Sequence, residues 1–128
     1  MFGIFNLFGR SAASSALDDA LRACGLHPLM VPEAVKLTLM RLHKEETAAG
    51  ARARDAAYRE AAELLAYCML GREPFLENNG ANAADRAEAR VETAIAEGDS
   101  RDAKLILLAL HAGVIAPEIA DRFDVAEQ

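Results

Sequence analysis

The chain has 128 residues, of which 52% are hydrophobic and 27% charged, and its net charge is −6. This composition is typical of one globular domain, 1–128, and excludes a disordered chain. The negative charge argues against a nucleic-acid partner, because a phosphate backbone requires a basic face. No stretch approaches the roughly 18 apolar residues that a membrane span needs. The two cysteines are expected as free thiols, which favours a cytoplasmic location.

Residues 1–14 form an apolar N-terminal segment that begins MFGIFNLFGR and holds Phe2, Ile4, Phe5 and Phe8. A signal peptide is not expected, because no basic region precedes the short apolar run. We expect the segment to pack against the protein's own helices or against a partner, with a homodimer as the expected assembly. Any membrane contact would be peripheral and confined to residues 1–10.

Glycine and proline divide the first half of the remaining chain into three predicted helices. The first covers 16–24, capped by Ser15, with Gly25 just past its end. The second begins at Pro32 and ends before Gly50. The third covers 51–70 and ends at Gly71; its final stretch, LLAYCML, carries no charge and is therefore expected to be buried on all sides.

The second half of the chain predicts three more helices. The stretch REPFLENNGAN predicts one short helical turn and then a turn at Asn78, Asn79 and Gly80. A fourth long helix over 83–97, capped by Asn82, precedes a fifth that begins near Ser100 and a last one over 117–124. No segment alternates with period two, so no sheet is expected. The predicted fold is an all-α, single-domain bundle of five to six helices.

Two predicted helices resemble each other in sequence. Residues 59–71, REAAELLAYCMLG, align without gaps on 101–113, RDAKLILLALHAG. Paired-helix repeats are one explanation. The other is that the third and fifth helices form the central pair of the bundle and share a buried pattern, and we adopt this second interpretation for the fold.

Catalytic and metal-binding motifs are absent from the sequence. His27, His43 and His111 lie far apart, and His43 and Glu46 stand in the reverse order of the E-x-x-H pair that binds metals in helical bundles. We interpret them as a charged helix flank. Cys68 lies within LLAYCML and is expected to be a buried, unreactive thiol. The sequence therefore predicts no enzyme activity, no metal site and no cofactor.

One short resemblance concerns the last twelve residues, PEIADRFDVAEQ. They resemble the first helix and turn of a helix-turn-helix unit, which implies a regulator related to DNA-binding proteins. The motif is incomplete, because the sequence stops before a recognition helix. The alternative is a C-terminal helix that docks Ile119 and Phe123 onto the bundle.

These observations favour a non-catalytic helical interaction or scaffold protein. The expected partner-binding residues are Phe2, Ile4, Phe5 and Phe8 of the N-terminal segment, with Asn78 and Asn79 on a loop. Two alternatives stay open. One is the helix-turn-helix-related regulator, and the other is a small-ligand-binding or enzymatic bundle with a pocket near 67–69 or His111.

Overall fold

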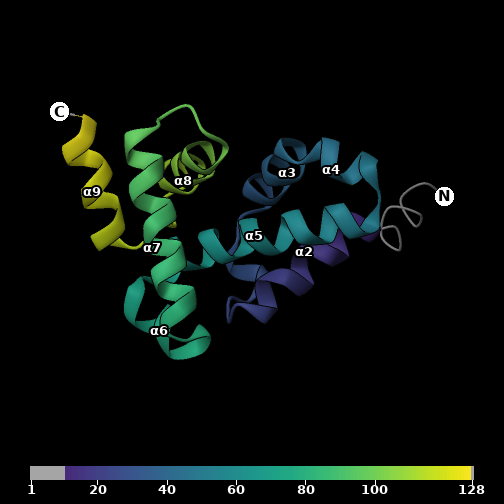
Figure 1. The fold of residues 1–128 in the computed structure, drawn as a ribbon, viewed down its shortest axis with the longest axis horizontal. Coiled ribbons are helices and arrows are strands. Elements are labelled where there is room, and N and C mark those ends of the chain that lie inside the picture. Colours follow the sequence, from purple (N-terminus) through teal and green to yellow (C-terminus); the bar gives the residue numbers. More distant parts are fainter. Residues whose placement is uncertain (1–10, 128) are drawn as a thin grey trace.

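A computed structural model describes residues 11–127 of the chain, and within this range the protein is entirely helical (Figure 1). The described elements are α2 (Ala12–Ala23), the 3-10 helix η1 (Pro28–Met30), α3 (Glu33–Leu42), α4 (Lys44–Ala49), α5 (Ala51–Leu70), α6 (Arg72–Asn79), α7 (Ala81–Ala96), α8 (Arg101–His111) and α9 (Pro117–Glu127). The all-α, single-domain prediction is confirmed. The predicted number of helices, five to six, is wrong, because the described range alone contains eight α-helices.

Helix α5 is the axis around which the other helices pack. It contacts α2, α4, α6, α7 and α8. Figure 1 shows α2, α3 and α4 gathered around the N-terminal part of α5, and α6 to α9 around its C-terminal end. The predicted bounds of this helix, 51–70, agree with the structure, and Gly71 ends it with a positive φ of 88°. An L-residue is strained at such a φ, which explains why the helix stops there.

The C-terminal half of α5 forms the centre of the hydrophobic core. Residues 64–68 are all buried, as predicted for the charge-free stretch LLAYCML, whereas Met69 and Leu70 at its end are only partly buried. The Tyr67 ring packs edge-on against Phe75 of α6, with 5.4 Å between the ring centroids. Each large apolar side chain buried in this way stabilises the fold by about 1.5–3 kcal/mol. Packing around this half of α5 therefore makes a large contribution to stability.

Helix α8 packs on α5, but it is not surrounded by other helices. It buries one face, Ala103, Leu105, Ile106 and Ala109, against α5, α7 and α3. The side chains of 107, 108 and 110 stay partly exposed. The sequence predicted that the third and fifth helices share the centre of the bundle. The third predicted helix, α5, lies there, whereas the fifth, α8, covers one side of α5.

Predicted helix boundaries are wrong at α2, α6 and α7. Helix α2 begins four residues early, because the Ser11 hydroxyl, not that of Ser15, accepts the capping bond from the Ser14 amide at 3.0 Å. The expected turn at Asn78 and Asn79 is instead the last turn of α6. Gly80, at φ 92°, makes the reversal alone, and α7 follows it directly without a cap from Asn82.

A buried ion pair joins α2 to α3. Lys36 Nζ donates to Asp18 Oδ1 at 3.2 Å, and both side chains are more than nine-tenths buried. Removing one member of a buried pair is strongly destabilising, because the other charge stays in a low-dielectric environment. This contact therefore fixes how α3 lies against α2.

None of the helices within residues 11–127 combines the length and the apolar character that crossing a membrane requires. The N-terminal residues Phe2, Ile4, Phe5 and Phe8 lie outside the described residues, so the expectation that they bind a partner stays a prediction.

Candidate functional site

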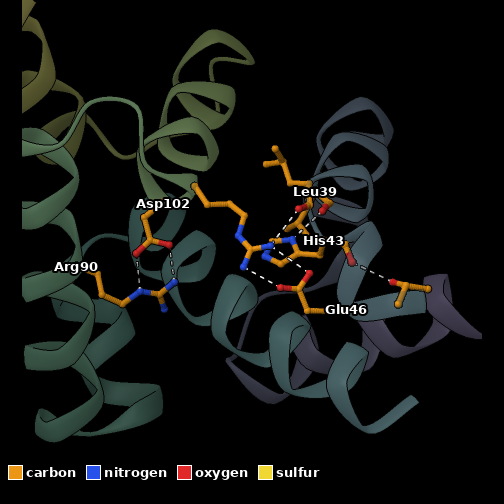
Figure 2. Close-up of polar contacts among 8 residues, drawn as sticks. Leu39, His43, Glu46, Arg90 and Asp102 are labelled. Carbon is orange, nitrogen blue, oxygen red and sulfur yellow. Dashed lines mark hydrogen bonds and ion pairs between the residues drawn. The ribbon is translucent and has the colours of Figure 1, made fainter. Parts of the chain in front are cut away.

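An open cavity of about 250 Å³ lies between the two groups of helices, and we call it the α5 cleft. Its lining comes from the corner between α3 and α4, from the N-terminal half of α5, and from α7 and α8. The lining residues are His43, Glu46, Ala53, Ala56, Ala57, Glu60, Ala61, Arg90, Arg101, Asp102 and Leu105. Figure 2 shows His43 and Glu46 on one side and Arg90 with Asp102 on the other.

The floor of the cleft is one face of α5. Ala53, Ala56, Ala57, Glu60 and Ala61 occupy positions i, i+3, i+4, i+7 and i+8, which places them on a single side of a helix. Packed helix axes lie about 8–10 Å apart, and larger side chains normally fill the space between them. Alanine does not reach across that distance, so the space above this face of α5 stays open.

His43 forms the corner at which the predicted helix 32–50 divides into α3 and α4. Its backbone N–H bonds to Met40 O at 3.2 Å, which leaves the Leu39 carbonyl without its usual helical donor. The His43 ring takes that role, with Nδ1 at 2.9 Å from Leu39 O. Because a carbonyl only accepts, Nδ1 carries the proton, and Nε2 of the neutral ring is an acceptor.

The orientation of His43 presents Nε2 to the cleft. The side chain is 7% exposed, and its ring meets Tyr58 edge-on at 6.3 Å between centroids. In the described part of the chain, every fully enclosed side-chain nitrogen or oxygen has a hydrogen-bond partner. Nε2 has no such partner there, so it is not enclosed and opens onto the cleft that His43 lines.

An arginine at the start of α8 spans the cleft to α4. Arg101 binds both carboxylate oxygens of Glu46, at 3.1 and 2.8 Å, and also donates to Leu42 O at 3.1 Å. This hydrogen bonding lowers the pKa of Glu46 and raises that of Arg101. Both groups therefore stay ionised, and the guanidinium satisfies a carbonyl at the C-terminal end of α3, where a positive charge is favourable.

A second arginine–carboxylate pair lies on the opposite wall. Arg90 of α7 donates from Nε and Nη2 to the two oxygens of Asp102, each at 2.9 Å, and from Nη1 to Glu60 O at 2.7 Å. Burial by itself lowers the pKa of Arg90, but the bonds to Asp102 outweigh it and the net shift is upward. This two-point pair links α7, α8 and the floor helix α5.

Glu60 is the remaining charged residue of the cleft. Its backbone carbonyl accepts the bond from Arg90, but its exposed carboxylate has no hydrogen bond or ion pair within 4 Å to any other residue of the range 11–122. The cleft thus offers two unused acceptors, the Glu60 carboxylate and His43 Nε2, beside two guanidinium groups that are already paired.

The two asparagines predicted to bind a partner, Asn78 and Asn79, lie at the end of α6. The Asn79 amide donates to Cys24 O at 2.9 Å and to Phe75 O at 3.1 Å, and so ties α6 to the end of α2. Asn78 donates to Pro74 O at 3.1 Å and is exposed. Neither residue lines the cleft, and their role as partner-binding residues stays a prediction.

The predicted thiol environment of Cys68 is confirmed. Cys68 is buried, and burial raises the pKa of its thiol to about 12. Cys24 is half-buried, and both cysteines are free. The described residues contain no group of three His, Cys, Asp or Glu side chains that could hold a metal ion. None of the residues 67–69 and His111 lines the α5 cleft, and a ligand pocket beside them stays a prediction.

The segment that resembles a helix-turn-helix unit forms α9. Its residue Ile119 is buried, as the docking alternative predicted, and Arg122 pairs with Glu88 of α7 at 2.9 Å. Both side chains therefore contribute to attaching α9 to the bundle.

Sequence reasoning noticed His43 and Glu46 but missed the other half of the site. A usable signal exists at Arg90, because the positions three and four residues away on its helix, 86, 87, 93 and 94, carry no acidic side chain. An arginine without a carboxylate on its own helix face indicates a partner on another element.

Comparison with known proteins adds no further information about the site: we found no match for the chain among protein-family models, curated proteins or solved structures.

Proposed function

We propose that the protein is a non-catalytic binding module and that the α5 cleft is its binding site. The observation that carries the proposal is the cavity of about 250 Å³ above the alanine face of α5. His43 lines this cavity, is more than nine-tenths buried, and has a ring nitrogen, Nε2, without a hydrogen-bond partner among the described residues. Small concave sites with a few convergent polar groups are the usual form of a binding pocket.

The composition of the cleft favours binding over catalysis. Its lining holds no serine, threonine, cysteine, lysine or tyrosine, so hydroxyl, thiol and amine nucleophiles are absent from it. Glu46 and Asp102 are each bound at two points by an arginine, and they are therefore fixed anions, unlike carboxylates that share or exchange a proton.

A screen of small fragments with a plugged variant tests the proposal. Ala57→Leu places a larger side chain on the cleft floor, and Ala89→Leu is the matched control, because Ala89 is exposed on α7 outside the cleft. We expect fragments that raise the Tm of the wild-type chain and of Ala89→Leu but have no effect on Ala57→Leu. Ala53→Leu is the second plugged variant if Ala57→Leu does not fold. The absence of any fragment with this pattern would refute the proposal.

Self-association through residues 1–10 is a second candidate function, and the apolar sequence of that segment favours it. Three of the five phenylalanines lie within these ten positions. Deleting residues 1–10 should lower the mass measured by light scattering from that of a dimer to that of a monomer. A full-length chain that is already monomeric at high concentration would exclude this function.

A further inference from the structure

The charge balance of the α5 cleft indicates which ligand it accepts. Three carboxylates, Glu46, Glu60 and Asp102, face two guanidinium groups, and His43 is neutral when Nδ1 alone carries a proton. Both arginines are engaged at two points by a carboxylate and at a third by a backbone carbonyl. An anionic ligand would have to displace these charge-assisted bonds.

The unused groups of the cleft are acceptors. His43 Nε2 is oriented by the bond from Nδ1 to Leu39 O. The Glu60 carboxylate interacts electrostatically with Arg90, but it is the one carboxylate of the described cleft lining without an ion pair within 4 Å. A ligand that donates hydrogen bonds and carries a positive charge satisfies both groups, whereas an anion or a pure acceptor satisfies neither.

The shape of the cleft fits a charged group on a short apolar chain. Methyl groups of the alanine floor and the Leu105 side chain provide apolar surface beneath the polar walls. Alkylammonium groups bury their methylene stem on such a surface and keep the charged end among acceptors.

We propose that the α5 cleft binds an alkylammonium group, with its nitrogen between Glu60 and His43 Nε2 and its carbon chain on the alanine floor. This inference rests on the function proposed above and specifies its ligand class. The group comes either from a lysine side chain of a partner protein or from a free amine, and both sources present the same chemistry to the cleft.

The test is an NMR titration of the full-length chain with n-butylammonium chloride, n-butanol and sodium butyrate. We expect saturable shifts of the Ala57 and Glu60 amides and of the His43 ring with butylammonium, and binding at least about fivefold weaker with the other two. Glu60→Gln should weaken butylammonium binding by about fivefold. Glu73→Gln should not, because Glu73 is an exposed acid on α6 outside the cleft.

A second arm distinguishes the two sources. A blocked tripeptide, acetyl-Ala-Lys-Ala-amide, is compared with butylammonium and with the same peptide carrying norleucine. Tighter binding of the lysine peptide assigns the group to a protein lysine, and tighter binding of butylammonium assigns it to a free amine. Either result supports the ammonium site.

Equal binding of butanol or butyrate, no saturable binding of any ammonium probe, or an unchanged affinity in Glu60→Gln overturns the inference. The proposed function fails separately. If fragments without an ammonium group bind and Ala57→Leu blocks them, the cleft is a binding site but the alkylammonium ligand class is wrong. If no fragment is blocked by Ala57→Leu, both the proposed function and the ligand class are rejected.

Discussion

The two halves of α5 lie in the same helix but have opposite roles. The N-terminal half, 51–60, buries a single large side chain, Tyr58, and its alanines form the floor of an open cleft. The C-terminal half, 61–70, buries Leu64, Leu65, Tyr67 and Cys68 in the hydrophobic core. Side-chain size therefore decides which half of α5 becomes core and which leaves space for a ligand.

The polar surroundings of the two halves differ as well. Around the cleft, ion pairs such as Arg101 with Glu46 reach across open space between helices. Around the core half, Tyr67 is buried and donates a hydrogen bond to Glu88, whose other partner is Arg122 of α9. Polar contacts thus border an opening at one end of α5 and anchor surrounding helices at the other.

The largest expected effect follows from truncating the core half. Leu65→Ala removes a side chain that is 1% exposed, and it should lower the free energy of unfolding by about 2–5 kcal/mol. Urea unfolding followed by circular dichroism measures this change.

The matched change in the other half is Ala57→Leu, which enlarges a partly exposed residue of the cleft floor. We expect the free energy of unfolding to change by less than about 1 kcal/mol, because the added atoms enter existing space. A loss as large as that of Leu65→Ala would mean that the two halves of α5 do not differ in packing.

The second prediction concerns Tyr67 at high pH. Burial, reinforced by the hydrogen bond to Glu88, raises the pKa of Tyr67 from 10.0 to about 12. The folded protein thus holds the phenolic proton more tightly than the unfolded chain, so this stabilisation is complete below pH 10 and disappears as the pH rises through 12. About 2 kcal/mol of unfolding free energy should be lost across that window.

Urea unfolding at several pH values, with tyrosinate absorbance recorded in parallel, tests this dependence. Tyr67→Phe should reduce the loss of stability above pH 10, since the variant has no phenol at this position. An equally steep loss in Tyr67→Phe would assign the effect to other groups.

The third prediction concerns the wall of the cleft. Asp102→Asn leaves the partly buried Arg90 without its carboxylate, and the free energy of unfolding should fall by about 1–2 kcal/mol. Because the pair is only partly exposed, added salt should reduce this difference little. A variant as stable as the wild type would show that the pair does not hold α7 and α8 together.

Much of the fold could be predicted from the sequence, because the signals are local. The bounds of α5, the burial of Cys68 and the start of α8 near Ser100, whose hydroxyl accepts from the Ala103 amide at 3.1 Å, all depend on residues within a few positions of one another. Glycine at φ 88° or 92° ends a helix whatever surrounds it. These features were predicted correctly or nearly so.

The division at His43 and the length of α6 could not be predicted in the same way. The sequence 32–50 is compatible with one continuous helix, and the break depends on a ring nitrogen that replaces a backbone donor to Leu39 O. Helix α6 includes Asn78 and Asn79, and the Asn79 amide reaches Cys24 O of a helix far away in the chain. Tertiary contacts here outweigh the turn preference of asparagine.

By itself, the sequence determined an all-α chain, the central helix α5 and the absence of recognisable catalytic motifs, because helix periodicity and termination are properties of neighbouring residues. Only the tertiary structure decided where the cleft lies. It brings His43, Glu60, Arg90 and Asp102 together from four separate elements, and their roles depend on which acid pairs with which arginine. Distances across the fold set that pairing, and no local pattern in the sequence encodes them.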